Sequence, residues 1–481
     1  MTLVDMLSYA YPELVLAIGS MALLITGVFM GENSAQKISL ASIAVLAIAV
    51  AFVVFRPAVG GATIFADAFR IDGFSEFVKA VLYITAGFAI MMSHRYFQGD
   101  DNWRFEYPIL ILLSVFGMSL MVSANDLIAL YMGIETQSLA LYVLASINRD
   151  SRRSTEAGLK YFVLGALSSC LMLYGASLIY GFTGSVSFTE IAKIAETSGG
   201  ENVGLIIGLV FLISGLAFKV SAAPFHMWTP DVYEGAPTPV TAFFAAAPKF
   251  AAMALFIRVL MTAFPTALAD WQMVIALIAV ASMMVGAFSA IAQTNIKRLM
   301  AYSSIGHVGY ALMGLAAGTA PGVSSILIYM TIYIVMTIGA FACILMMRRR
   351  GGLTEDISDL SGLTKTNMPL ALVLTILLFS LAGIPPMAGF FGKWYVFVAA
   401  VDAGLVWLAI LGVLASAVSA YYYLRIVWFM WFDEPAPAFE RDVGPALQMT
   451  AGVSAIMVFP ILVIFIGVLY QAADRAAAAL F

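Results

Sequence analysis

Long uncharged apolar runs are the feature that most restricts the fold of this sequence. A helix of about 20 apolar residues crosses the hydrocarbon core of a bilayer, and about fourteen runs of that length follow one another with short polar loops between them. We therefore predict an all-α, polytopic membrane protein with about fourteen transmembrane helices in a single transmembrane domain, residues 1–481. The predicted spans are residues 12–30, 38–55, 72–92, 107–123, 126–146, 157–181, 203–222, 238–262, 271–293, 296–317, 322–347, 368–400, 404–430 and 445–471.

The composition leaves no room for a large soluble domain. Hydrophobic residues make up 62% of the chain and charged residues 11%, whereas soluble domains carry roughly 25% charged residues. The first residues, MTLVDMLSYAYPE, place an acidic residue where a signal peptide would have a basic region, and no small-residue cleavage site closes the first apolar run. We expect the first span to be retained.

The sequence also argues against a cofactor in this chain. Its two cysteines, Cys170 and Cys343, lie inside apolar runs, so neither a disulfide nor an iron–sulfur cluster with its usual four thiolates is expected. The fingerprints GxGxxG and GxxxxGK[ST] do not occur, so no dinucleotide or phosphate site is predicted. His94, His226 and His307 are the only histidines, so no metal site is predicted. The net charge of −4 gives no reason to expect nucleic acid as a partner.

Charges in the loops predict the orientation of the chain. Basic residues follow spans five, nine and eleven, at 149–153, 297–298 and 348–350, so these three loops lie on one face. Loops rich in lysine and arginine stay in the cytoplasm. The loop 190–201 on the opposite face is mainly acidic. We therefore expect both termini on the periplasmic side.

Two spans are interrupted by proline. Pro224 lies in KVSAAPFHMW of span seven, and Pro385 and Pro386 lie in LAGIPPMAGFFGKW of span twelve. Irregular backbone at membrane depth is tolerated only inside protein or beside a water-filled cavity. The odd offset of five spans is compatible with an inverted repeat of spans 4–8 and 9–13, as in transporters, although two unrelated proline kinks would look similar. The predicted divisions are 1–106 (three N-terminal spans), 107–262 (first repeat), 271–431 (second repeat) and 432–481 (last span).

Four ionisable residues stand out within the predicted spans: Glu135, Lys219, Lys249 and Lys393. Each costs about 2.5–3.5 kcal/mol at a helix centre on insertion scales, which points to a function. The alternatives are a structural Glu135–Lys219 ion pair or lysines that snorkel to the headgroups. Snorkelling is hard for Lys249 because apolar residues flank it on both sides, and Lys393 lies close enough to a break to be solvated there.

Buried lysines near a carboxylate are suited to proton transfer. Burial favours a neutral amine and a nearby carboxylate favours a charged one, so a lysine between these influences can load and release a proton near neutral pH. His307 in SSIGHVGY, and less so His226, are candidates for passing protons between lysines, since imidazole titrates near pH 6.5. A polar histidine that faces another helix is the alternative. Residues near span ends are predicted to be interfacial (Glu76, Lys79, Arg258, Arg425) or a cytoplasmic anchor (Lys160).

Four motifs resemble the antiporter-like subunits of respiratory complex I. They are GIETQSLALYVL, LAFKVSAAPFHMWTPDVYEGAPTPV, NIKRLMAYSSIGHVGYALMG and LAGIPPMAGFFGK, in the order and spacing of that family, and the resemblance covers about 107–431. It implies fourteen helices, inverted repeats in spans 4–8 and 9–13, and broken helices seven and twelve. It also implies proton translocation through Glu135, Lys219, Lys249 and Lys393, with His307 at a polar position of span ten.

Further expectations follow from this resemblance. FMN, iron–sulfur clusters and quinone would be bound by other subunits, and the partners would be other membrane-arm subunits, including the M-type subunit, in the bacterial inner membrane. The M-type member has a glutamate where this chain has Lys393, and the L-type member has a long C-terminal lateral helix that is missing here. No carboxylate in the second half corresponds to Glu135, so a partner for Lys393 would come from a neighbouring chain, or the site would stay neutral at rest.

Three rival functions differ in what they require. A Na⁺/H⁺ antiporter needs hard oxygen ligands for sodium, and Glu135 is the only clear buried carboxylate in the sequence. A passive scaffold has no need of four buried charges. Quinone binding by this chain has no sequence feature of its own.

Overall fold

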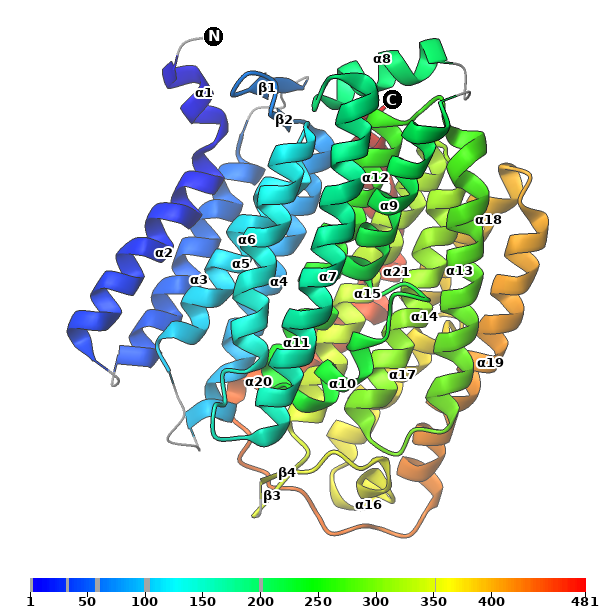
Figure 1. Cartoon of the computed structure of the whole chain (residues 1–481). Helices are drawn as coiled ribbons and strands as arrows, with labels where there is room; N and C mark the ends of the chain where they lie inside the picture. The colour runs from blue at the N-terminus through cyan, green and yellow to red at the C-terminus, as the bar shows by residue number, and fades with distance from the viewer. Residues whose placement is uncertain (1–2, 32–33, 57–60, 99–103, 199–201, 351) are drawn as a thin grey trace.

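Long helices, nearly parallel to one another, form most of this chain (Figure 1). The computed structural model describes residues 3–31, 34–56, 61–98, 104–198, 202–350 and 352–481. The long helices are α2 (Tyr11–Met30), α3 (Ala35–Val54), α4 (Gly73–Gln98), α5 (Glu106–Ser123), α6 (Leu127–Ala145), α7 (Arg152–Thr183), α9 (Val203–Val220), α11 (Thr238–Ala245) with α12 (Ala247–Arg258), α13 (Leu268–Ile291), α14 (Ile296–Ala316), α15 (Ala320–Leu345), α17 (Met368–Ala382), α18 (Ala388–Asp402), α19 (Val406–Phe432) and α20 (Pro445–Ile456).

Short elements connect or extend these helices. They are α1 (Leu3–Tyr9), α8 (Phe188–Ser198), α10 (Trp228–Gly235), α16 (Leu363–Thr366), α21 (Leu462–Ile464), α22 (Ile466–Ala478), a 3₁₀ turn (Ile357–Leu360), two π-helical turns (Val259–Ala263 and Met457–Ile461) and the antiparallel hairpins β1–β2 (Ala62–Ile64, Phe69–Ile71) and β3–β4 (Arg348–Arg349, Gly352–Leu353). The prediction of an all-α membrane protein is confirmed.

Twelve helices within the described residues are long and apolar enough to cross a membrane. Two more elements account for the fourteen predicted spans. One is α14, which carries Lys297 and Arg298 in its first turn and packs along α13. The other is the broken pair α17 and α18, whose halves have 15 residues each. The last span also differs from the prediction, because it bends at a π-helical turn around Pro460 before α22 begins.

Both predicted breaks are present. Helix α9 ends at Val220, and Ser221 adopts a left-handed conformation (φ 66°) before Pro224. Helix α17 ends at Ala382, and Gly383 (φ 84°) precedes the proline pair. In each case a left-handed residue ends the helix by turning the chain away from its axis.

A third break was not predicted. Span eight, expected to be continuous over 238–262, is divided at Ala246 (φ −112°, ψ −89°) into α11 and α12. Pro248 follows directly and has no N–H to donate to the preceding turn. Lys249 consequently lies in the first turn of α12.

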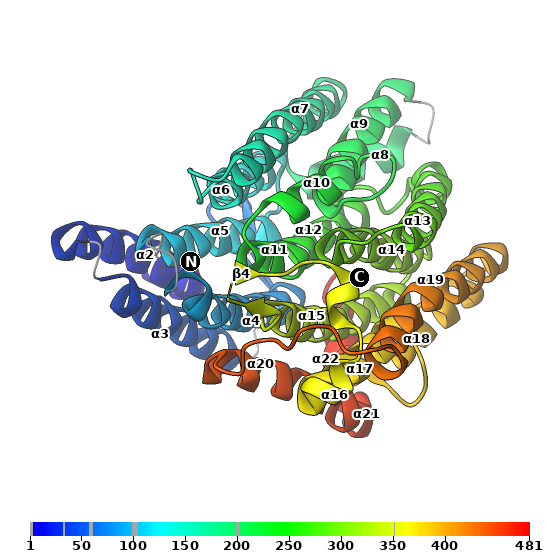
Figure 2. The same cartoon turned by 90° about the horizontal axis from the view of Figure 1, so that it is seen from below.

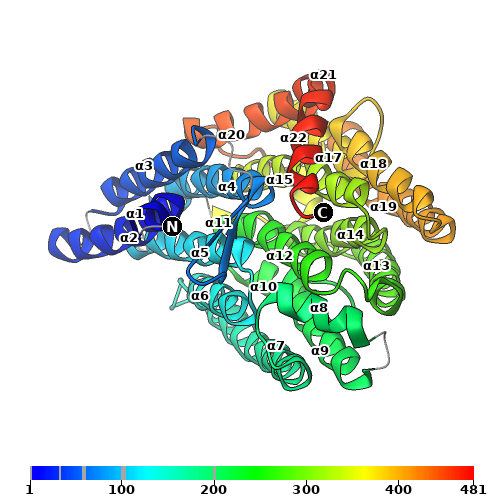
Figure 3. The same ribbon diagram turned by 90° about the horizontal axis from the view of Figure 1, so that it is seen from above.

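Views along the bundle place α12, α14 and α15 near its middle, with α2 and α3 at one end and α19 at the other (Figures 2 and 3). The most apolar windows of α2 and α3 are only 22% and 28% buried, whereas the window in Thr238–Ala263 is 100% buried. Close backbone contact holds α13 against α14, since a Cβ on Gly286 would lie 2.5 Å from the amide nitrogen of Gly306. The lysine-bearing helix α12 is therefore enclosed by protein on all sides.

Candidate functional site

Glu135 on α6 and Lys219 on α9 face each other through serine hydroxyls. The Lys219 Nζ lies 4.0 Å from Glu135 Oε1 and donates hydrogen bonds to the hydroxyls of Ser138 (2.9 Å) and Ser169 (3.3 Å). Ser169 in turn donates to Glu135 Oε1. The carboxylate and the amine are thus joined by an unbroken hydrogen-bond chain, along which a proton can move.

The position of Lys219 in its helix adds to this arrangement. It lies in the last turn of α9, directly before the break at Ser221. The carbonyl end of a helix carries a partial negative charge, which favours a cation there. Lys219 therefore has two electrostatic partners, a carboxylate and a helix end, and its side chain is only 6% exposed.

Lys249 occupies a different environment. Its side chain is buried, its Nζ donates to the hydroxyl of Ser304 on α14, and it lies 5.2 Å from the centre of the Tyr233 ring. No carboxylate of the described residues lies within ion-pair distance of it. The structure excludes snorkelling for Lys249, because its amine is held inside the bundle by a neighbouring helix.

Lys393 on α18 reaches back to the break in its own span. Its Nζ donates to the carbonyl of Ala382 at the end of α17 and to the hydroxyl of Ser416 on α19, both at 2.9 Å, and lies 4.9 Å from the Tyr310 ring. The residue is 4% exposed. A carbonyl freed by the break, together with a hydroxyl, takes the place that a carboxylate holds beside Lys219.

His307 on α14 lies between two tyrosines. Its Nδ1 is 2.5 Å from the hydroxyl of Tyr329 on α15, and its Nε2 is 3.1 Å from the hydroxyl of Tyr423 on α19. On the same helix, Ser304, which holds Lys249, lies one turn before His307. Tyr310, whose ring is 4.9 Å from the Lys393 amine, lies 6.2 Å from the His307 ring. His226 is half-buried after the first break, and no contact with the lysines is found for it among the described residues. The geometry favours His307 as the link between the second and third lysines.

Comparisons with known proteins agree with this picture. A family model described as NADH:quinone oxidoreductase/Mrp antiporter, transmembrane, matches residues 124–419. NADH-quinone oxidoreductase subunit N of Parvibaculum lavamentivorans is 57% identical over 447 residues, which cover 93% of this chain and 92% of that protein. NADH-quinone oxidoreductase subunit N 1 of Rhizobium meliloti is 56% identical and covers 100% of this chain and 99% of its own. The chain belongs to the family of NADH-quinone oxidoreductase subunit N.

A solved structure supports the same assignment. One chain of respiratory complex I from Thermus thermophilus with bound aureothin is 33% identical to this subunit N family member, with a TM-score of 0.81. The match covers 96% of this chain and 98% of that one.

This subunit N family member also contains a buried ion pair that was not predicted. Lys79 on α4, predicted to be interfacial, is 1% exposed, and its Nζ lies 2.5 Å from Glu13 Oε1 on α2. Ser119 donates to the same oxygen (2.7 Å) and lies 2.6 Å from the hydroxyl of Tyr83. The interfacial assignment of Lys79 was wrong because α2 and α5 enclose the helix end that carries it.

Arg258, at the end of α12, was likewise predicted to be interfacial and is fully buried. It makes a bidentate pair with Asp72, at 3.0 and 2.8 Å, and its Nε donates to the carbonyl of Val122 (2.8 Å). A signal was present in the sequence, because Asp72 and Glu13 are acids at the edges of apolar runs and each could offset one buried base.

A charged cluster joins α7, α10 and α14 on the face of the basic loops. Asp231 on α10 lies 2.7 Å from Lys160 and 2.8 Å from Arg298, which also contacts Glu234 at 3.0 Å. Partial burial raises the pKa of Asp231, but Lys160 and Arg298 outweigh that effect and hold the pKa below its ordinary value. Lys160 is therefore ion-paired within the chain, in addition to lying at the predicted membrane boundary.

Proposed function

We propose that this chain is a proton-translocating subunit in the membrane arm of an NADH:quinone oxidoreductase, with FMN, iron–sulfur clusters and quinone on other subunits. The observation that carries the proposal is a set of buried amines, Lys219, Lys249 and Lys393, each held by hydroxyl groups inside the bundle. A cation in hydrocarbon is costly unless it is paired. Two of these three amines have no carboxylate beside them, which leaves their protonation free to change.

The proposed order of events begins at Glu135. A change in the charge or position of this carboxylate alters the charge that Lys219 can hold, through the hydroxyl of Ser169. The change in protonation then passes from Lys219 to Lys249 and, through His307, to Lys393. The halves 107–262 and 271–431 are proposed to be the two inverted repeats that contribute these sites. Against 100 mV each proton costs about 2.3 kcal/mol, an amount that a change in lysine environment is able to supply.

We propose that the face with the basic loops is cytoplasmic and that the bacterial inner membrane holds the chain. Hairpin β3–β4 and α16 lie on this face, opposite the two ends of the chain (Figure 1). Lysine and arginine in short loops keep those loops in the cytoplasm. Both termini would then be periplasmic.

Neighbouring membrane-arm subunits, the M-type subunit among them, are the proposed partners. The Glu135 side chain keeps 24% of its surface exposed on α6, where apolar residues such as Met132 and Leu139 are also exposed. A carboxylate that faces lipid at membrane depth is unfavourable. A neighbouring chain that covers this surface removes that cost.

A Na⁺/H⁺ antiporter is the second candidate, because the matching family model also includes Mrp antiporters. Sodium needs several hard oxygen ligands. Among the described residues, no group of three or more His, Cys, Asp or Glu side chains is arranged to hold a metal ion. Proton uptake that is equal with and without sodium would separate the two functions in favour of the proton.

The decisive experiment replaces Lys219 by alanine in the native membrane. NADH oxidation and proton uptake into inverted vesicles are measured together, with assembly checked on a native gel. We expect both activities to fall at least tenfold in an assembled complex. Lys193→Ala is the matched control, since this exposed lysine on α8 pairs with Glu190 and, among the described residues, with no other acid. If Lys219→Ala behaves like that control, the chain is a scaffold and the proton relay is wrong.

A further inference from the structure

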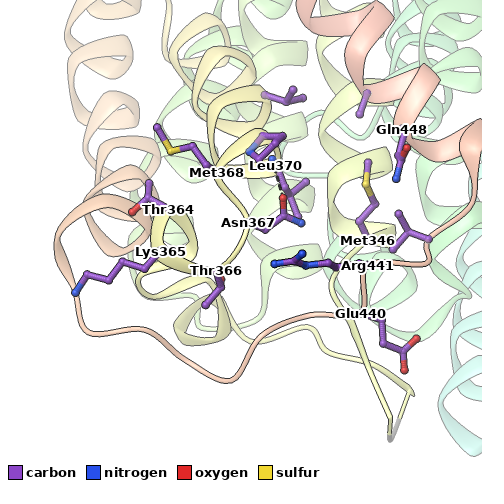
Figure 4. Close-up of a pocket in the computed structure, with 14 residues that line it drawn as sticks. Met346, Thr364, Lys365, Thr366, Asn367, Met368, Leu370, Glu440, Arg441 and Gln448 are labelled. Carbon is purple, nitrogen blue, oxygen red and sulfur yellow. Dashed lines mark hydrogen bonds between the residues drawn. The ribbon is translucent and has the colours of Figure 1, made fainter.

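A cavity of about 670 Å³ lies where α17 and α20 begin, on the face of the basic loops (Figure 4). It lies at the opposite end of α17 from the Lys393 site and takes no part in the proposed proton transfer. Its walls come from the end of α15, the link between α16 and α17, and the connection 433–444 with the start of α20. This volume lies within the range of about 300–1,000 Å³ that is typical of small-molecule sites.

The walls change character along the direction of the membrane. Val373 on α17 and Ala451 on α20 line the deeper part, between one and two turns inside the spans. Leu370 and Gln448 lie in the first turns of α17 and α20, and Arg441 lines the part outside the helix ends. A ligand that fits both parts has a polar group at the level of the helix ends and an apolar group that extends into the bilayer.

Arg441 supplies an unused positive charge. Its guanidinium points into the cavity toward Asn367 (Figure 4). Among the described residues it has neither a hydrogen bond nor an ion pair, whereas the neighbouring Glu440 points away and lies 3.9 Å from Arg348. Guanidinium binds phosphate oxygens through two parallel hydrogen bonds, so an anionic phosphate complements this side of the cavity.

We propose that this cavity binds one phospholipid, with its phosphate on Arg441 and the start of an acyl chain along Leu370, Val373 and Ala451. A free phosphate ion shares the headgroup chemistry but would leave the apolar wall in water. A segment of a neighbouring protein is the other occupant that the test has to separate.

The first test measures phospholipid that stays with the intact complex. Wild-type and Arg441→Gln complexes are purified in mild detergent with added phosphatidylglycerol, washed, and weighed by native mass spectrometry. We expect the variant to retain one phospholipid fewer. Arg350→Gln is the matched control, because it removes the same charge from an exposed residue on the same face that does not line the cavity. Equal retention by all three complexes overturns the proposal.

A second test identifies the occupant and its source. Gln448 is replaced by a photo-crosslinking residue, benzoylphenylalanine, in the assembled complex in its own membrane. A phospholipid adduct supports the site, and an adduct with another subunit, or none with lipid, overturns it. Lipid-depleted complex is then titrated with phosphatidylglycerol or with inorganic phosphate while the unfolding temperature is followed. An unfolding temperature that rises with the lipid but not with phosphate, and does not rise in Arg441→Gln, supports a bound phospholipid. A rise that phosphate reproduces overturns the proposal.

Discussion

Two groups of buried cations in this chain are equally shielded from water but have different partners. Lys79 and Arg258 each contact a carboxylate, at 2.5 and 2.8 Å, whereas Lys249 and Lys393 contact only hydroxyls, a carbonyl and aromatic rings. A buried pair fixes both charges, since removing one leaves the other uncompensated. Burial alone does not indicate function here. The missing counter-charge distinguishes a lysine whose proton can leave from a cation that holds helices together.

The contacts of Lys219 are intermediate between those of the two groups. Glu135 is near, at 4.0 Å, but serine hydroxyls make the direct contacts with the amine. Such a carboxylate influences the charge of the lysine without fixing it. This arrangement is expected where a change at the carboxylate has to alter the protonation of the lysine. It also explains why the sequence was compatible with both a structural ion pair and a proton relay.

The largest effect on stability is expected from breaking a buried ion pair. Arg258→Met breaks the bidentate pair and leaves Asp72 buried with the partly exposed Arg70, at 3.3 Å, as its remaining ion-pair partner among the described residues. Breaking a buried pair costs up to about 3–5 kcal/mol. We expect little assembled complex on a native gel and a marked fall in its unfolding temperature. The double variant Asp72→Leu with Arg258→Met should recover most of the assembly. If the double variant is as unstable as the single one, the pair is not the source of the effect.

Lys249 should respond in the opposite way. Lys249→Met is expected to assemble normally, because no buried carboxylate loses its partner, while coupled NADH oxidation and proton uptake fall at least tenfold. Lys249→Arg sharpens the comparison, since arginine keeps its charge under all ordinary conditions. It should also fail to pump. Normal pumping by Lys249→Arg would mean that a fixed charge suffices and that this lysine resembles Arg258 in its role.

A smaller effect is expected from the hydroxyl that holds Lys249. A hydrogen bond to a charged group contributes about 1.5–3 kcal/mol, and Ser304→Ala removes that contact in the charged state. We expect a several-fold fall in the coupled rate with assembly unchanged. Ser325→Ala is the control, because this buried serine donates only to the carbonyl of Gly322 on its own helix. Equal rates in the two variants would remove Ser304 from the site.

The smallest effect on stability is expected at the loop cluster around Asp231, whose charges are paired but partly exposed to solvent. Because Lys160 and Arg298 lower the pKa of Asp231, its ion pairs stabilise the fold above the unfolded pKa near 3.8 and lose that effect as pH falls through the lower folded value. Solvent limits the contribution to about 1 kcal/mol or less. Asp231→Asn should therefore lower the unfolding temperature slightly at pH 7, with the difference from wild type vanishing in strong acid. A difference that grows on acidification contradicts this assignment.

The sequence was sufficient for features that depend on residues close to one another in the chain. Apolar runs predicted the spans, and Pro224 and Pro385 predicted two of the breaks, because proline acts on the helix that contains it. Features set by the rotation and packing of distant helices were not predictable. The tyrosines around His307 come from α15 and α19, and the burial of Lys79 depends on α2 and α5. The break at Ala246 was missed as well, because Pro248 in AAAPKF follows alanines, without the serine or glycine that precedes the proline at the other two breaks.

The Asp72–Arg258 pair restricts how relatives of this chain can diverge. Its members are 186 positions apart along the sequence, yet losing Asp72 alone leaves the buried charge of Arg258 unmatched, and losing Arg258 alone leaves Asp72 with only Arg70 near it. A lineage can lose this pair only if both positions change almost together, or if the second position changes before selection removes the first change. The two positions should therefore be inherited as one unit, whereas the proposed relay retains Lys249 and Lys393 for activity.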